Sequence, residues 1–150
     1  MTKNQNMGGI TKIRLSPSKD IESMIFNNGE TKAFLLPGKA TLEPYFTYST
    51  ARVSSEPIEN GYMFFNKISW RIPIDQKSLI QSLFPFIKGL CVIEITFSNS
   101  TVKIFGSNDI PLLLNFKPLN QGTVEDYNGL ELTASNIDYL PGRFGSIITS

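Results

Sequence analysis

The sequence predicts a mainly β protein: an antiparallel β-sandwich or barrel of about eight short strands, with one short helix. Three observations predict this fold. Short runs rich in Val, Ile, Thr, Phe and Tyr recur along the chain, turn residues separate them, and only one segment has a helical period. The 150 residues are enough for one domain with its own core. We expect a flexible N-terminal arm at 1–9, a single β-rich domain at 10–143 and a C-terminal arm at 144–150.

The first third of the domain contains four predicted strands and a tight turn. Residues 10–15 alternate between apolar and polar side chains, which is typical of a half-buried strand. The runs IESMIF (21–26) and TKAFLL (31–36) flank Asn27-Asn28-Gly29, a sequence that favours a two-residue hairpin turn. The segment 40–55 is rich in Thr, Tyr, Phe and Val, and we expect SSEPIENG to end it.

Gly61 to Asp75 gives the clearest strand pattern in the chain. Ile68, Trp70 and Ile72 share one face with a single polar residue, Asn66, and polar residues recur on the other face. Pro73 has no N–H to donate to a neighbouring strand. We therefore expect this strand to be an edge near its end.

The remaining elements are one helix and a series of strands. The segment DQKSLIQSLFPFIKG (75–89) has an apolar stripe at helical spacing and a capping Asp75, so it is the predicted helix. The strands LCVIEITF (90–97) and TVKIF (101–105) flank a Ser-Asn-Ser turn. The last candidates are IPLLLNF at 110–116, LELTAS at 130–135 and the tip at 147–149.

The residue types present exclude several kinds of chemistry. The chain has no histidine, so a Ser-His-Asp or Cys-His nucleophile cannot form within it. Cys91 alternates with Ile93 and is expected to be a small buried residue. Glu94 is expected to pair across strands with Lys103, and Glu125 and Asp126 to lie in a solvated loop. We predict no catalytic residues, no cofactor and no metal site.

Charge and hydropathy restrict the partners. The 14 basic residues are spread along the chain and the net charge is +1, so we expect no sequence-specific binding of nucleic acid. No apolar run is long enough to span a membrane, and the N-terminus lacks a signal-peptide core. We therefore expect a protein made in a cytoplasm without membrane insertion. The charged fraction is 18%, below the usual ~25%, which suggests that a partner covers part of the surface.

Two features leave alternatives open. The segment GSND at 106–109 is interpreted as a turn, although its backbone N–H groups could hold an anion. The 11 Phe and 5 Tyr place aromatic residues on both faces of some strands. Such strands lie centrally in a sandwich or are covered by another subunit, and an aromatic platform for sugars is the alternative.

The stretch from Trp70 to Pro141 contains a series of short motifs. A hairpin leads into a Phe-Gly-Ser corner, an acidic residue and Pro-Leu follow, and then comes an apolar strand. An aromatic-Asn-Gly step and a final strand ending in Ser follow it. The matching segments are VKIFGSNDIPLLLNF, DYNGLELTAS and DYLPG. In this pattern the chain resembles short structural proteins encoded by tailed phages and prophages of Bacteroides-type bacteria. The resemblance covers about half of the 150 residues.

The resemblance implies a virion protein of the tail or head-to-tail connector, assembled as a homo-oligomeric ring and without catalytic residues. Its partners would be copies of itself and neighbouring virion proteins, and we expect 2–9 and 144–150 to make those contacts. Deleting 144–150 should then leave the core folded but abolish ring formation. The alternatives are a carbohydrate-binding β-sandwich, alone or in a fibre, and a small enzyme that uses only carboxylates.

Overall fold

A computed structural model describes residues 9–44, 46, 50–73, 81, 86, 89–118 and 129–149. Its regular elements are two short 3-10 turns, η2 (Ser18–Asp20) and η3 (Glu59–Gly61), and the ten strands β1 (Ile10–Pro17), β2 (Ile21–Asn27), β3 (Glu30–Leu35), β4 (Arg52–Ile58), β5 (Met63–Pro73), β6 (Leu90–Phe97), β7 (Val102–Phe105), β8 (Leu112–Pro118), β9 (Gly129–Asp138) and β10 (Arg143–Ile148).

The ten strands form one open sheet in the order β2-β3-β10-β7-β6-β8-β9-β5-β4, and β1 pairs with β6 beside this path. All pairs are antiparallel except β3 with β10. The prediction of a mainly β, mostly antiparallel protein is confirmed. The finer prediction needs correction, because the described strands close no barrel and number ten rather than about eight.

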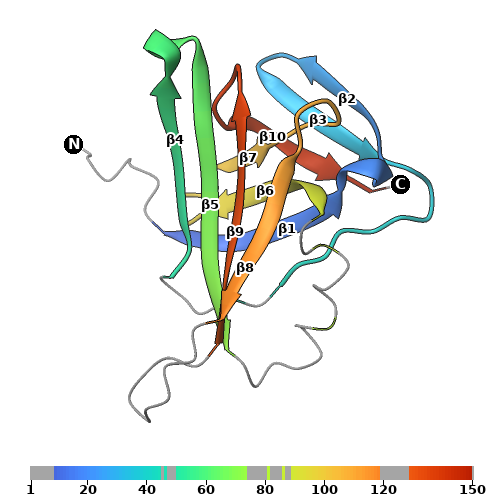
Figure 1. Cartoon of the computed structure of the whole chain (residues 1–150). Helices are drawn as coiled ribbons and strands as arrows, with labels where there is room; N and C mark the ends of the chain where they lie inside the picture. The colour runs from blue at the N-terminus through green and yellow to red at the C-terminus, as the bar shows by residue number, and fades with distance from the viewer. Residues whose placement is uncertain are drawn as a thin grey trace.

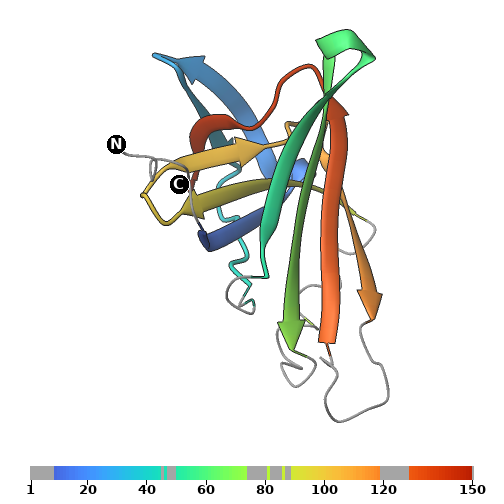
Figure 2. The same ribbon diagram turned by 90° about the vertical axis from the view of Figure 1, so that its left-hand side faces the viewer.

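The sheet bends between β6 and β8. Strand β6 pairs with β7 over Ile93–Thr96, but with β8 only at Leu90 and Cys91. Beyond that point β8 continues along β9. In Figures 1 and 2, β8, β9, β5 and β4 form a long upright layer, and β1, β6 and β7 run across it. One continuous sheet thus supplies two facing layers.

The main core lies between these two layers. Trp70 is fully buried at its centre and is its largest side chain. Most of the other members come from β1, β5, β6, β8 and β9 and include Ile13, Leu15, Ile68, Ile72, Ile93, Ile95, Leu112, Leu114 and Leu132. The alternation of β5 agrees with the expectation, because Ile68, Trp70 and Ile72 are buried and Lys67 is exposed. Burying each large aliphatic side chain contributes roughly 1.5–3 kcal/mol.

A second core covers the other face of β6 and β7. Val92 and Ile104 pack there against Leu35 of β3 and Ile147 of β10, together with Ile21 and Ala33. Strand β6 is therefore buried on both faces, since Ile93 and Ile95 face the main core. This explains its nearly continuous apolar sequence by contacts within one chain.

The expected arms and helix have different outcomes. Arg143 to Ile148 form β10, which lies between β3 and β7, and Ile147 is only 3% exposed. We therefore place this segment in the folded domain rather than in an arm, and we no longer expect the core to survive its deletion. Residues 1–8 and almost all of the predicted helix at 75–89 lie outside the described residues.

Two turn predictions are confirmed and one strand boundary is corrected. Asn28 and Gly29 have φ angles of 55° and 79°, as a two-residue hairpin between β2 and β3 requires. β6 and β7 form the hairpin expected around residues 98–100. However, Pro57 lies inside β4 instead of ending a strand. It is tolerated because β4 is the last strand of the sheet.

Candidate assembly interface

Cys91 is fully buried in the main core, as its pattern predicted. Burial removes water from around the sulfur and thereby disfavours the thiolate. This raises the pKa of the Cys91 thiol to about 12. The residue is therefore a small core side chain and a poor nucleophile.

Glu94 is also buried, but its partner differs from the one expected. Lys103 lies opposite Ile95, and its ammonium group sits 5.2 Å from the centre of the Phe144 ring. Glu94 instead faces Arg14 of β1. Arg14 Nη1 donates to both carboxylate oxygens of Glu94, at 2.9 and 3.2 Å. The partner of Glu94 therefore comes from β1, which pairs with β6, and not from β7 of the same hairpin.

The Arg14–Glu94 pair also holds the C-terminal strand. The backbone N–H of Ile147 donates to Glu94 Oε2 at 2.9 Å, and Arg14 Nη2 donates to the carbonyl oxygen of Ile147 at 3.3 Å. The two side chains therefore bond to β10 where a neighbouring strand would. The pair has a structural role: it satisfies backbone groups that would otherwise be buried without partners.

The corner at 106–109 is a turn in which Ser107 and Asn108 form hydrogen bonds within the chain. Gly106 has a φ of +88°, and a Cβ there would lie 3.3 Å from the carbonyl oxygen of Cys91. Ser107 N–H donates to the Ile110 carbonyl, and the Ile110 N–H donates to Ser107 Oγ. Asn108 reaches across to the carbonyl of Ile21 at 3.0 Å. The corner thus carries the chain from one layer of the sheet to the other.

A chain of amide side chains supports this corner from the upright layer. Buried Asn66 of β5 accepts a hydrogen bond from Ser55 of β4 at 2.6 Å and donates to Asn136 of β9 at 3.0 Å. Asn136 in turn donates to the carbonyl of Ile110 at 3.0 Å. Asn66 is therefore polar on an otherwise apolar face because its hydrogen bonds link β4, β5 and β9, and through Asn136 the corner at Ile110.

Other chemistry in the described part of the chain is sparse. Within the described residues, no three His, Cys, Asp or Glu side chains lie close enough together to hold a metal ion. No helix among them is long and apolar enough to cross a membrane. Glu125 and Asp126, expected in a loop, lie outside the described residues.

The two ends of the sheet are its most exposed strands. β2 and β4 are terminal in the strand order, so each lacks a second neighbouring strand within the described chain. β2 exposes Ile25 and Phe26, which are 52% and 71% accessible. A groove of about 410 Å³ runs beside Ile25, Phe34 and Ile148 on the same β2-β3-β10 end. This end therefore presents apolar side chains next to an open strand edge.

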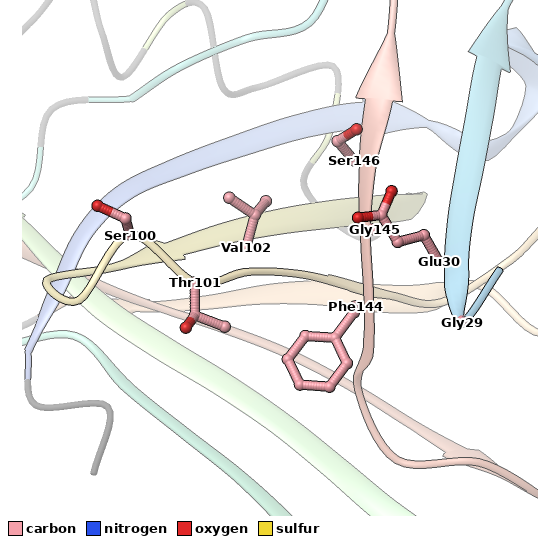
Figure 3. A pocket seen from close by; sticks show the side chains of 8 residues that line it. All are labelled: Gly29, Glu30, Ser100, Thr101, Val102, Phe144, Gly145 and Ser146. Atoms are coloured by element: carbon pink, nitrogen blue, oxygen red, sulfur yellow. The ribbon is translucent and has the colours of Figure 1, made fainter. Parts of the chain in front are cut away.

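A second groove lies where β7 and β10 separate. The two strands pair only at Arg143–Ile104 and Phe144–Lys103. Past this point an open space of about 530 Å³ lies between residues 100–102, residues 144–146 and the turn at Gly29 and Glu30. Figure 3 shows these side chains around the opening, with the Phe144 ring and the Glu30 carboxylate at its sides.

A third exposed apolar group lies at one end of the β5–β9 pair. Phe64 pairs with Asp138, so the chain just before β5 and just after β9 lies at that end. Tyr62, Ile137, Tyr139 and Leu140 are all at least 47% accessible.

Comparisons with protein-family models, curated proteins and solved structures found no match to this chain.

Proposed function

We propose that the protein is a non-enzymatic structural subunit of a tailed-phage virion. Copies of it assemble into a ring in the tail or the head-to-tail connector and contact neighbouring virion proteins there. The protein would be made in the host cytoplasm and would be located in the virion. The observation that carries this proposal is the open sheet, whose two terminal strands have different surfaces.

A ring needs two different surfaces on each subunit, because every contact joins one surface to the other around the circle. β2 offers an edge with exposed Ile25 and Phe26. β4 offers the opposite edge, with exposed Arg52, Glu56 and Pro57. Strand edges bind other strands through backbone hydrogen bonds, and the side chains select the partner. The resemblance of residues 70–141 to phage structural proteins supports the same class of function.

Phe26→Lys tests the role of the β2 end, with Leu113→Lys as the matched control. Both replace an exposed apolar residue by lysine, but Leu113 lies on β8 inside the sheet order. Electron microscopy of the purified protein should show closed rings for the wild type and the control, and isolated subunits for Phe26→Lys. Rings that persist with Phe26→Lys would contradict the proposed contact.

A carbohydrate-binding module is a second candidate because of the exposed Tyr62 and Tyr139 at one end of the β5–β9 pair. Exposed tyrosines offer flat amphipathic surfaces that suit weak ligand contacts. This candidate predicts monomers that bind glycans on an array, and Tyr139→Ala should abolish the binding. An oligomer with no hits on the array would reject it.

A further inference from the structure

The groove between β7 and β10 is an interruption inside the sheet. Past Phe144 and Lys103, the residues of the two strands are no longer paired with each other. Thr101 and Val102 on one side and Gly145 and Ser146 on the other line the open space instead. The open space spans residues 100–102 on one wall and 144–146 on the other, so the groove is short. On β10 the next residue, Ile147, already donates its N–H to the Glu94 carboxylate.

The lining indicates what this groove can bind. Most of its residues are Gly, Ser or Thr, so it has no deep pocket for a large side chain. Strand addition suits such a site because the partner's backbone supplies the hydrogen bonds and its side chains contribute little. Among the described residues that line the groove, Glu30 is the one with a charge, and it is exposed at the side of the groove. The site therefore fits an extended, polar segment that carries a positive charge.

We propose that the groove binds residues 1–8 of a second copy of this chain as an added strand. This inference rests on the proposed self-assembly. The segment MTKNQNMG has polar residues throughout its middle, and Lys3 is its one charged residue, which complements Glu30. The proposed self-assembly makes a second copy the source of this segment, and the cross-linking below distinguishes it from docking within one chain.

The lengths also agree. Three residues on each wall of the groove correspond to about 10 Å of strand. Residues 1–8 span up to roughly 27 Å when extended, so they can cross a gap between subunits and still fill the groove. Gly9, the first described residue after this segment, has a fixed position, since its carbonyl accepts a hydrogen bond from Ser98 N–H at 2.8 Å.

Cysteine cross-linking tests the inference on the full chain. The variant carries Asn4→Cys and Ser146→Cys, and the matched control carries Asn4→Cys and Thr133→Cys, with the second cysteine on β9 outside the groove. Native Cys91 does not interfere because it is fully buried. Docking should raise the rate of disulfide-linked dimer formation by about a hundredfold over the control, as expected for millimolar effective concentration.

Charge reversal provides the second measurement. Lys3→Glu or Glu30→Lys alone should slow the cross-linking, and the two together should restore it. Cross-linking that is no faster than in the control, or that occurs only within one chain, would overturn the inference. Light scattering on the wild type separates the two proposals. Oligomers without the cross-link contradict the groove alone, whereas a wild type that stays monomeric contradicts both.

Discussion

Glu94 shows how much a single residue can depend on distant parts of this chain. Its side chain is 4% exposed, and it binds Arg14 from β1 and the backbone of Ile147 from β10. Removing one member of a buried ion pair is costly because the other is left as an unpaired charge. The residue therefore joins β1 and β10, the first and last strands in the sequence, to β6 at the centre of the strand order.

We expect Glu94→Gln to lower the free energy of unfolding by about 2–4 kcal/mol, because Arg14 then loses its counter-charge. The partial exposure of Arg14 limits this loss. Glu43→Gln is the control: its pair with Lys12 is 3.9 Å long and more than 40% exposed on both sides. The control should cost less than about 1 kcal/mol. Urea unfolding measures both, and equal losses in the two variants would contradict the structural role of the buried pair.

Cys91 makes stability depend on pH in the alkaline range. Its pKa is about 12 in the folded chain, against 9.0 for an unperturbed thiol. Above pH 9 the unfolded chain loses this proton while the folded chain keeps it, so stability falls as the pH rises. The slope should be about 1.4 kcal/mol per pH unit between roughly 9 and 12. Cys91→Ala should lack this component in urea unfolding series, and identical slopes for both proteins would contradict the assignment.

Individual residues differ in how well local sequence reveals them. The burial of Cys91 and the face of Asn66 follow from the alternation of their own strands. The partner of Glu94 does not, because Arg14 lies eighty residues away and meets it only through the β1–β6 register. The hydrogen bonds of Asn66 likewise need three strands to be in place.

At the scale of elements, β10 departs most from expectation. Its sequence predicts a free arm, because nothing local indicates a parallel partner and β3 precedes it by more than a hundred residues. The hairpins, in contrast, were predictable because Asn28-Gly29 and the Ser-Asn-Ser turn specify their own geometry. The predicted end of the strand before Pro57 is wrong. Proline usually ends a strand, but the edge strand β4 tolerates it.

Gly145 fixes how closely β10 approaches β3. A Cβ at this position would clash with the carbonyl oxygen of Thr31. Gly145→Val should therefore push the two strands apart and cost about 1–3 kcal/mol, as overpacked sites do. Ser146→Val is the control at the next position of the same strand. Thermal unfolding should show a clear loss for Gly145→Val and little change for the control. No difference between them would mean that β10 does not need this close approach.

At the scale of the whole molecule, one bent sheet builds two cores and still ends in open strands. The length of the sequence predicts one domain with its own core, whereas the structure has two clusters of buried apolar side chains. The bend at 106–110 could not be predicted, because the same residues suit any tight turn. A sandwich and a folded single sheet differ only in which strands pair at that corner.

The central claim is that this subunit works by assembling with itself. Multi-angle light scattering of the purified full chain measures this most directly. The account predicts a single species with a mass that is a whole-number multiple of 16.8 kDa and that persists on dilution. A mass of 16.8 kDa over the whole range of concentrations would contradict it.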